Sequence, residues 1–299
     1  MPRGVRWGLP SNREPWNFKP MSLTTRVLEL DASLWDTNPE CIDQLRSGIW
    51  VAVVLKQLYS FAEMKKVVER LDHEYAENQN SKAWATMQFP ESFRGWFLGE
   101  NLNLLEGDLF DYFEREPVFS ANMKRLFIDI PGGENRIFHC LSKIDRGRRY
   151  IAAPGPDVDY RYQFTTLRGH AEGGYIPIHC DNEQSWRPSY EHLLTQIHPN
   201  LFSFVLMIGK PIGGGNLRIY NQRIKPEQRQ TIEQARYSKT DDLFMNDYVE
   251  INLDPGDLVL ADSGMHPHEV TKVVGSKIRW TMCSFMAQSK AGQAVYCWG

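Results

Sequence analysis

The chain has 299 residues, 42% of them hydrophobic and 24% charged, and its formal net charge at pH 7 is −3. This length is enough to bury a large core in one elaborated domain or in two. The near-neutral charge gives no electrostatic basis for contact with nucleic acid or with an anionic membrane, so we expect an enzyme whose partner is a small molecule.

The N-terminal half is expected to supply an arm and a layer of helices. Residues 1–20 combine arginines with Pro, Gly and Trp and predict an irregular arm. The apolar run Ile49–Leu55 is too short to span a bilayer and predicts a buried strand. Ser60-Phe-Ala-Glu63 is a capping box followed by apolar residues at helical spacing, which predicts a helix over 60–78. Helical patterns mixed with turn signals extend the predicted helical layer over about 56–145.

From about residue 158 the pattern changes to short β-like runs separated by turns rich in Gly, Pro and Asn. Two helical inserts are expected, near 189–198 and 226–237. Eight short strands with helices outside them predict a mainly β fold with a double-stranded β-helix, a jelly roll of the cupin type, over about 158–298. With the helical layer, this predicts a single domain over 21–299. The expected strands are Arg161–Arg168, Gly174–Cys180, Phe202–Gly209, Asn216–Asn221, Asp247–Leu253, Gly256–Asp262, Glu269–Val274 and Arg279–Ala287.

A candidate metal site lies in this half, in the run His179-Cys-Asp181 and in His268, 89 positions after His179. Alternate residues of a strand share a face, so His179 and Asp181 should point the same way. Two imidazoles and one carboxylate can occupy one triangular face of an octahedral metal and leave the opposite face open, as in non-haem Fe(II) oxygenases. We therefore predict His179, Asp181 and His268 as metal ligands and catalytic residues.

The second histidine ligand has a competitor, because His266-Pro-His268 is expected to place both imidazoles on one strand face. We choose His268, because the strand continues after it and because Arg279 follows at a suitable spacing, and we assign His266 to the pocket rim or to a place behind the ligands. Arg279 and Thr281 should share one strand face. His170 also lies near the predicted metal strand, and the other histidines are interpreted as structural or surface residues.

This order of residues resembles the Fe(II)/2-oxoglutarate-dependent oxygenases, whose hallmark is His-x-Asp/Glu, a distal His, and an Arg with Ser or Thr two positions after it. The resemblance covers about residues 160–298. The C-terminal half looks most like the carrier-independent halogenases of indole-alkaloid biosynthesis and their hydroxylating relatives, in runs such as Gly214-Gly-Asn-Leu-Arg-Ile-Tyr-Asn221 and the terminal Tyr-Cys-Trp298. Those halogenases carry Gly where this chain has Asp181, and the vacancy holds chloride. With Asp181 in place, the resemblance implies hydroxylation or another oxidation.

The resemblance further implies Fe(II) and 2-oxoglutarate as cofactors, O2 as co-substrate, and release of succinate and CO2. Arg279 would bind the distal C5 carboxylate of 2-oxoglutarate, because a guanidinium offers a bidentate fork of permanent charge, and Thr281 would add a hydrogen bond. The expected reaction is hydroxylation of an aliphatic C–H bond of a small specialised metabolite. Substrate contacts are expected from a helical segment around Trp186 and from one face of the strand that contains Tyr162, Phe164, Thr166 and Arg168, although the two aromatic residues suit an ordinary core equally well.

Two other functions stay open: a protein or nucleic-acid hydroxylase or demethylase, and a non-catalytic cupin-like metal-binding protein. The lack of a basic patch weakens the first, and the complete ligand set weakens the second. The five cysteines form no CxxC pair, and their odd number indicates free thiols in a reducing compartment. The start of the sequence has no apolar segment of the secretory type, so we expect a cytoplasmic protein. The oligomeric state stays open.

Overall fold

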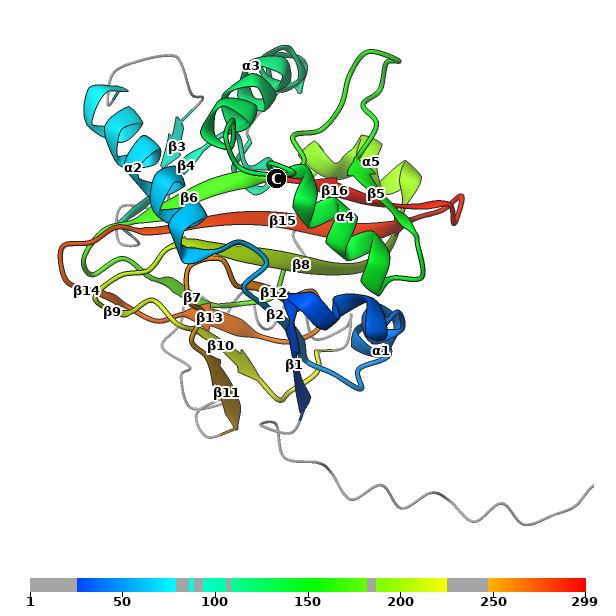
Figure 1. The fold of residues 1–299 in the computed structure, drawn as a ribbon. Coiled ribbons are helices and arrows are strands. Elements are labelled where there is room, and N and C mark those ends of the chain that lie inside the picture. Colours follow the sequence, from blue (N-terminus) through cyan, green and yellow to red (C-terminus); the bar gives the residue numbers. More distant parts are fainter. Residues whose placement is uncertain (1–25, 79–85, 89–93, 106–108, 182–186, 225–246) are drawn as a thin grey trace, which may run out of the picture.

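The structure is a computed structural model of the chain, and it describes all residues except 1–25, 79–85, 89–93, 106–108, 182–186 and 225–246 (Figure 1). The predicted N-terminal arm, the helical insert at 226–237 and Trp186 therefore lie outside the described residues. Within the described part, no helix has the length and apolar character needed to cross a membrane.

Two β-sheets form the centre of the molecule (Figure 1). The larger sheet has ten strands in the order β1-β2-β12-β8-β15-β6-β4-β3, with β16 beside β15 and β5 beside β16. The smaller sheet has the order β11-β10-β13-β7, and β14 pairs with β9. The bounds of the larger sheet are β1 Val27–Asp31, β2 Ala52–Lys56, β3 Thr86–Gln88, β4 Gly95–Leu98, β5 Arg149–Ala152, β6 Thr166–His170, β8 Ile197–Gly209, β12 Leu258–Ala261, β15 Arg279–Ser289 and β16 Ala294–Trp298. The other strands are β7 Ile176–His179, β9 Gly213–Gly214, β10 Leu217–Tyr220, β11 Tyr248–Ile251, β13 His268–Val270 and β14 Val273–Val274.

Strand alternation sorts the apolar residues of the larger sheet between its two faces. In β12, Leu258 and Leu260 join the core on the helical side, whereas Val259 and Ala261 join a cluster shared with the smaller sheet. Leu217 and Ile219 of β10 belong to that second cluster. Because both faces of β12 are buried, its sequence is apolar at every position and carries no two-residue period.

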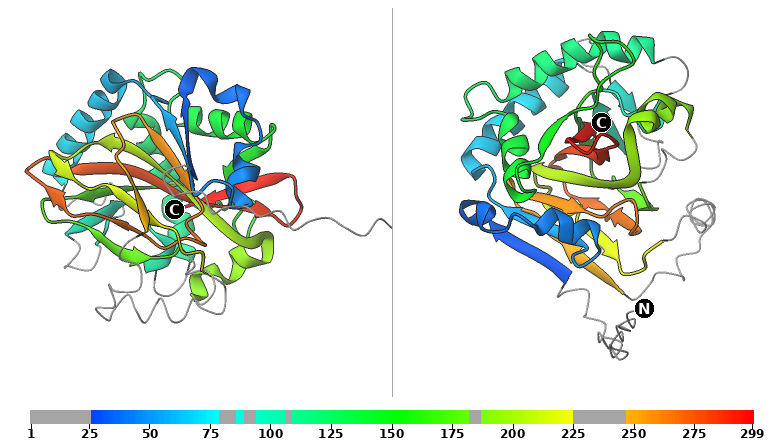
Figure 2. Two further views of the ribbon diagram at one scale, coloured as in Figure 1. Left: turned by 90° about the horizontal axis from the view of Figure 1, so that it is seen from below. Right: turned by 90° about the vertical axis from the view of Figure 1, so that its right-hand side faces the viewer.

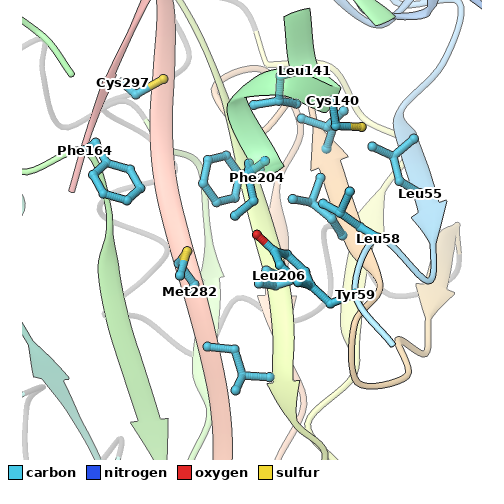
Figure 3. Close-up of a cluster of buried hydrophobic side chains, with 14 of the residues drawn as sticks. Leu55, Leu58, Tyr59, Cys140, Leu141, Phe164, Phe204, Leu206, Met282 and Cys297 are labelled. Atoms are coloured by element: carbon cyan, nitrogen blue, oxygen red, sulfur yellow. The ribbon is translucent and has the colours of Figure 1, made fainter. Parts of the chain in front are cut away.

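Helices cover the outer face of the larger sheet, on the side away from the smaller sheet (Figures 1 and 2). Figure 3 shows Cys140 and Leu141 of one helix above Phe204 and Leu206 of β8 and Met282 of β15, all of them buried. This packing fixes the sheet from outside and leaves its inner face for the functional groups. The helices are α1 Cys41–Arg46, α2 Phe61–Asn78, α3 Phe110–Leu126, α4 Asn135–Ile144 and α5 Glu191–Gln196, with short 3-10 turns at Ala32–Thr37, Leu102–Leu104 and Pro188–Tyr190.

The helix predicted over 60–78 is confirmed as α2. Its capping box is formed, because the backbone N–H of Glu63 donates to Ser60 Oγ over 3.3 Å and the backbone N–H of Ser60 donates to Glu63 Oε2 over 2.7 Å. The predicted helical layer is wrong in one part, since β3 and β4 lie within it and extend the larger sheet beyond β6. The strand predicted over Ile49–Leu55 is confirmed as β2.

The mainly β jelly roll with flanking helices is also confirmed, although the strand bounds differ from those predicted. The strand expected over Arg161–Arg168 is the clearest error, because β6 begins only at Thr166. Tyr162 and Phe164 before it are buried in two separate hydrophobic clusters. Their packing, which joins them to different neighbours, prevents a single regular strand.

Candidate active site

The smaller sheet brings the three predicted metal ligands together. His179 is the last residue of β7 and lies directly opposite His268, the first residue of β13. Asp181 follows β7, where its backbone N–H donates to the carbonyl of Ser263 over 2.9 Å. One ligand atom from each side chain can be chosen so that all three lie within 4.8 Å of one another. The sequence therefore predicted this group correctly as neighbours in space: His179 and His268 are 89 positions apart in the chain, and the pairing of β7 with β13 brings them together.

The distances within this group suit a single ion. Asp181 Oδ1 lies 3.4 Å from His179 Nε2, and Asp181 Oδ2 lies 3.5 Å from His268 Nε2. Adjacent ligand atoms of an octahedral ion at about 2.1 Å would be about 3 Å apart, so only small adjustments are needed to hold one. Three donors from one side also leave the opposite positions of the ion to other ligands.

The two imidazoles are oriented from behind by backbone carbonyls. His179 Nδ1 donates to the carbonyl of Pro177 over 2.8 Å, and His268 Nδ1 donates to the carbonyl of His266 over 3.0 Å. A carbonyl can only accept, so each Nδ1 carries a proton, and each Nε2 is the ring nitrogen that faces Asp181. Fixing the tautomer through the second ring nitrogen is the usual support of a metal-bound histidine.

Asp181 is ionised in this setting. Burial raises the pKa of its carboxyl, but the charge interaction and hydrogen bonds with His268 and His179 lower it further, and the net pKa lies well below 3.8. A metal ion would take the place of the imidazole protons that face this carboxylate, and one ionised carboxylate with two neutral imidazoles is a donor set of the kind that Fe(II) accepts.

Arg279 lies on the facing sheet, at the start of β15, with only 3% of the residue exposed. Its Nε donates to the carbonyl of Gly215 over 2.7 Å, and Nη1 is 3.5 Å from Thr281 Oγ1. Gly215 has φ +67°, and a Cβ there would lie 2.8 Å from Arg279 Cδ, so a glycine is required for this approach. The contact between Gly215 and Arg279 was not predicted from the sequence.

No carboxylate in the described part of the chain pairs with Arg279. Burial lowers the pKa of the guanidinium to about 10, so it is still charged at neutral pH. A buried charge without a counter-ion is costly, and an anionic ligand would relieve that cost. The residues present therefore fit a group that brings its own carboxylate, as 2-oxoglutarate does.

A cavity between the sheets joins the metal ligands to the inner face of the larger sheet. Beside the three ligands, its lining includes Arg168 from β6 and Phe285 from β15. Tyr162 and Phe164, which were considered as substrate contacts, do not line it, whereas Arg168 does. Among the described residues around a larger hollow of about 840 Å³, between α2 and the end of β8, there is no histidine or cysteine.

Two further histidines surround the site without lining this cavity. His266 is 1% exposed, and its Nδ1 donates to the carbonyl of Tyr220 over 3.0 Å, so it supports His268 through its own backbone carbonyl. His170 lies directly opposite Arg279 in the β6–β15 pair and is fully buried. Burial and the charges of Arg279 and Arg168 hold the pKa of His170 well below 6.5, so this imidazole is neutral.

Comparison with known families gives a match over nearly the whole chain. The model described as "Carrier-protein-independent halogenase WelO5" matches residues 24–299. Among curated proteins, no relative matches this sequence.

Solved structures share the fold at low sequence identity. A structure of an N-substituted L-amino acid dioxygenase from Burkholderia ambifaria is 14% identical in sequence, with a TM-score of 0.52. The alignment covers 86% of this chain and 91% of the dioxygenase chain. A second structure with that description, in complex with alpha-KG, is 15% identical, with coverages of 87% and 91% and a TM-score of 0.50. The jelly-roll fold is thus shared with oxygenases far beyond the range of recognisable sequence similarity.

Proposed function

This chain belongs to the family of carrier-protein-independent halogenases, and from that premise we propose that it hydroxylates an aliphatic C–H bond of a small specialised metabolite. Its class is that of the Fe(II)/2-oxoglutarate-dependent oxidoreductases, as the sequence predicted. The observation that supports hydroxylation is the position of Asp181, whose carboxylate lies 3.4 and 3.5 Å from the two histidines and would take the third protein position at the ion. A chloride bound to the metal would need that position.

In the proposed mechanism, His179, Asp181 and His268 hold Fe(II). The carboxylate of Asp181 offsets part of the charge of the ion, and the backbone carbonyls behind the two histidines keep each Nε2 directed at it. Bound Fe(II), with 2-oxoglutarate and O2, supplies an oxidative decarboxylation that yields succinate, CO2 and an oxidant able to attack a C–H bond.

The larger sheet would bind the co-substrate. Arg279 would donate to the C5 carboxylate of 2-oxoglutarate, and Thr281 would orient the guanidinium through its hydroxyl. Apolar side chains of the cavity, such as Leu217 and Val259, keep water from the reacting atoms. Binding and orientation are the contributions of the protein, and the cofactors carry the oxidation.

Succinate formation by purified protein supplied with Fe(II), 2-oxoglutarate and O2 tests this function. Asp181→Ala should abolish it and weaken Mn(II) binding, measured separately by calorimetry. A matched control is Glu269→Gln: this residue follows His268, but its carboxylate accepts from Tyr220 Oη over 2.9 Å outside the ligand group. Wild-type turnover in Asp181→Ala would reject the metal assignment, and lack of succinate from the wild type would favour a non-catalytic binding protein.

The hydroxylation outcome needs a substrate screen with mass detection of an added oxygen. Membership of the family supports metabolites over macromolecules as the first compounds to test. An N-substituted amino acid, the substrate named for the Burkholderia ambifaria enzyme, is a reasonable member of that screen. Consumption of a protein or an oligonucleotide in place of any metabolite would overturn the small-molecule assignment.

A further inference from the structure

Arg168 is a second guanidinium on the wall of the metal cavity. It lies in the middle of β6, directly opposite Thr281 of β15 and Phe97 of β4. Directly opposed residues of antiparallel strands share a face, so the side chains of Arg168 and Thr281 lie on the same face of the sheet. It lines the same cavity as the three ligands, from the sheet that faces them.

The surroundings of Arg168 position its guanidinium without neutralising it. Its Cζ lies 5.4 Å from the ring centroid of Phe97 and 5.7 Å from that of Phe285. Its Nε is buried and has no hydrogen-bond partner, and within the described part of the chain no carboxylate forms an ion pair with it. Since guanidinium is always charged and its donors are costly to bury unpaired, an acceptor from outside the described residues would stabilise this arrangement.

The charges of the assembled site identify which ligand is missing. Fe(II) and Arg279 together bring three positive charges, and Asp181 and the two carboxylates of 2-oxoglutarate bring three negative charges. His179 and His268 are neutral as ligands. The charge of Arg168 is then left over, and among the described residues that line the cavity Asp181 and Arg168 are the ionised ones.

We propose that Arg168 binds a carboxylate of the organic substrate, so that this enzyme acts on small organic acids whose apolar part packs near Phe97 and Phe285. The inference rests on the proposed function and adds a substrate class to it. A planar guanidinium between two rings presents its outer N–H groups in a fixed direction, which suits a bidentate contact with a carboxylate. Such an anchor would set which C–H bond of the acid faces the metal.

Matched acids and amides test the proposal without turnover. The protein is loaded with Mn(II) and 2-oxoglutarate under nitrogen, and its thermal unfolding is measured with phenylacetate, 4-phenylbutyrate and N-acetyl-L-phenylalanine and with the primary amide of each. We expect at least one acid to raise the unfolding temperature more than its amide does. If no acid exceeds its amide, substrate recognition through Arg168 is overturned.

Variants then assign the acid-dependent shift to this residue. Arg168→Gln should lose the shift and Arg168→Lys should retain part of it, because a charge remains. The control Arg218→Gln should keep it, since Arg218 is one-third exposed and paired with Glu250 outside the cavity. A shift that survives in Arg168→Gln would overturn the proposal.

The C1 carboxylate of 2-oxoglutarate is the other possible source of the anion, and calorimetry distinguishes it. A tenfold or larger loss of 2-oxoglutarate affinity in Arg168→Gln would assign Arg168 to the co-substrate and overturn the substrate assignment. Failure of the proposed function has a different signature, because the wild type would then form no succinate whatever the acids do.

Discussion

Replacing Arg279 by methionine should affect stability in opposite directions with and without 2-oxoglutarate. In the protein alone, the pKa of this fully buried guanidinium is lowered from 12.5 to about 10 by burial. A basic group whose pKa is lowered on folding destabilises the folded state at every pH at which it is charged there. This penalty is lost only as the pH rises from the folded pKa of about 10 toward 12.5. At pH 7 the penalty is therefore fully present and amounts to about 3 kcal/mol.

Methionine removes this charge and keeps most of the volume, but it also removes the hydrogen bond to the carbonyl of Gly215, which costs about 1 kcal/mol. The net expectation is that Arg279→Met is about 2 kcal/mol more stable than the wild type without 2-oxoglutarate. With the co-substrate at about 100 times its Kd, the wild type should gain about 2.7 kcal/mol and the variant close to nothing.

Urea unfolding with Mn(II) in place of Fe(II), with and without 2-oxoglutarate, measures both effects. Arg218→Met is the matched control. Its side chain is 33% exposed and pairs with Glu250 over 2.6 Å, so its loss should cost no more than about 1 kcal/mol and leave the gain from 2-oxoglutarate intact. The reasoning is refuted if Arg279→Met is the less stable protein without 2-oxoglutarate and still gains as much from it as the wild type.

Three further predictions concern Asp181, Asp262 and Ser60. Asp181→Gly opens the ligand position, so its Co(II) affinity should rise with chloride concentration, and calorimetry that finds no chloride dependence would contradict this. Burial raises the pKa of Asp262 to about 7, although the charges of Arg223 and Arg26 lower it. The destabilisation of the folded protein by the ionised carboxylate therefore grows as the pH rises from about 4 to 7. Asp262→Asn should therefore gain about 3 kcal/mol over the wild type between pH 5 and 8 in urea unfolding, and a constant difference would show that the carboxyl does not titrate there. Ser60→Ala removes the N-cap of α2 and should cost about 1 kcal/mol, with no change in metal affinity by calorimetry.

Local chemistry explains which elements could be predicted. The capping box and helical spacing of α2 depend on residues within a few positions of one another, so the sequence was sufficient there. β3 and β4 have little pattern of their own; β4 is a strand because it pairs with the edge of β6, and β3 because it pairs with β4. The start of β6 was misplaced for a related reason, since Tyr162 and Phe164 alternate like strand residues but pack into different clusters.

The sequence by itself determined the chemistry of the candidate site. The types and spacing of His179, Asp181 and His268 predicted a donor set, and the resemblance to the Fe(II)/2-oxoglutarate-dependent oxygenases implied Arg279 as an anion anchor. Only the tertiary structure decided which groups share the cavity. Arg168 lines the cavity because β6 pairs with β15, and Arg279 packs against Gly215 because the glycine has no Cβ in the way. Both contacts join residues far apart in the chain, and the pairing of strands that creates them is set by burial over the whole molecule.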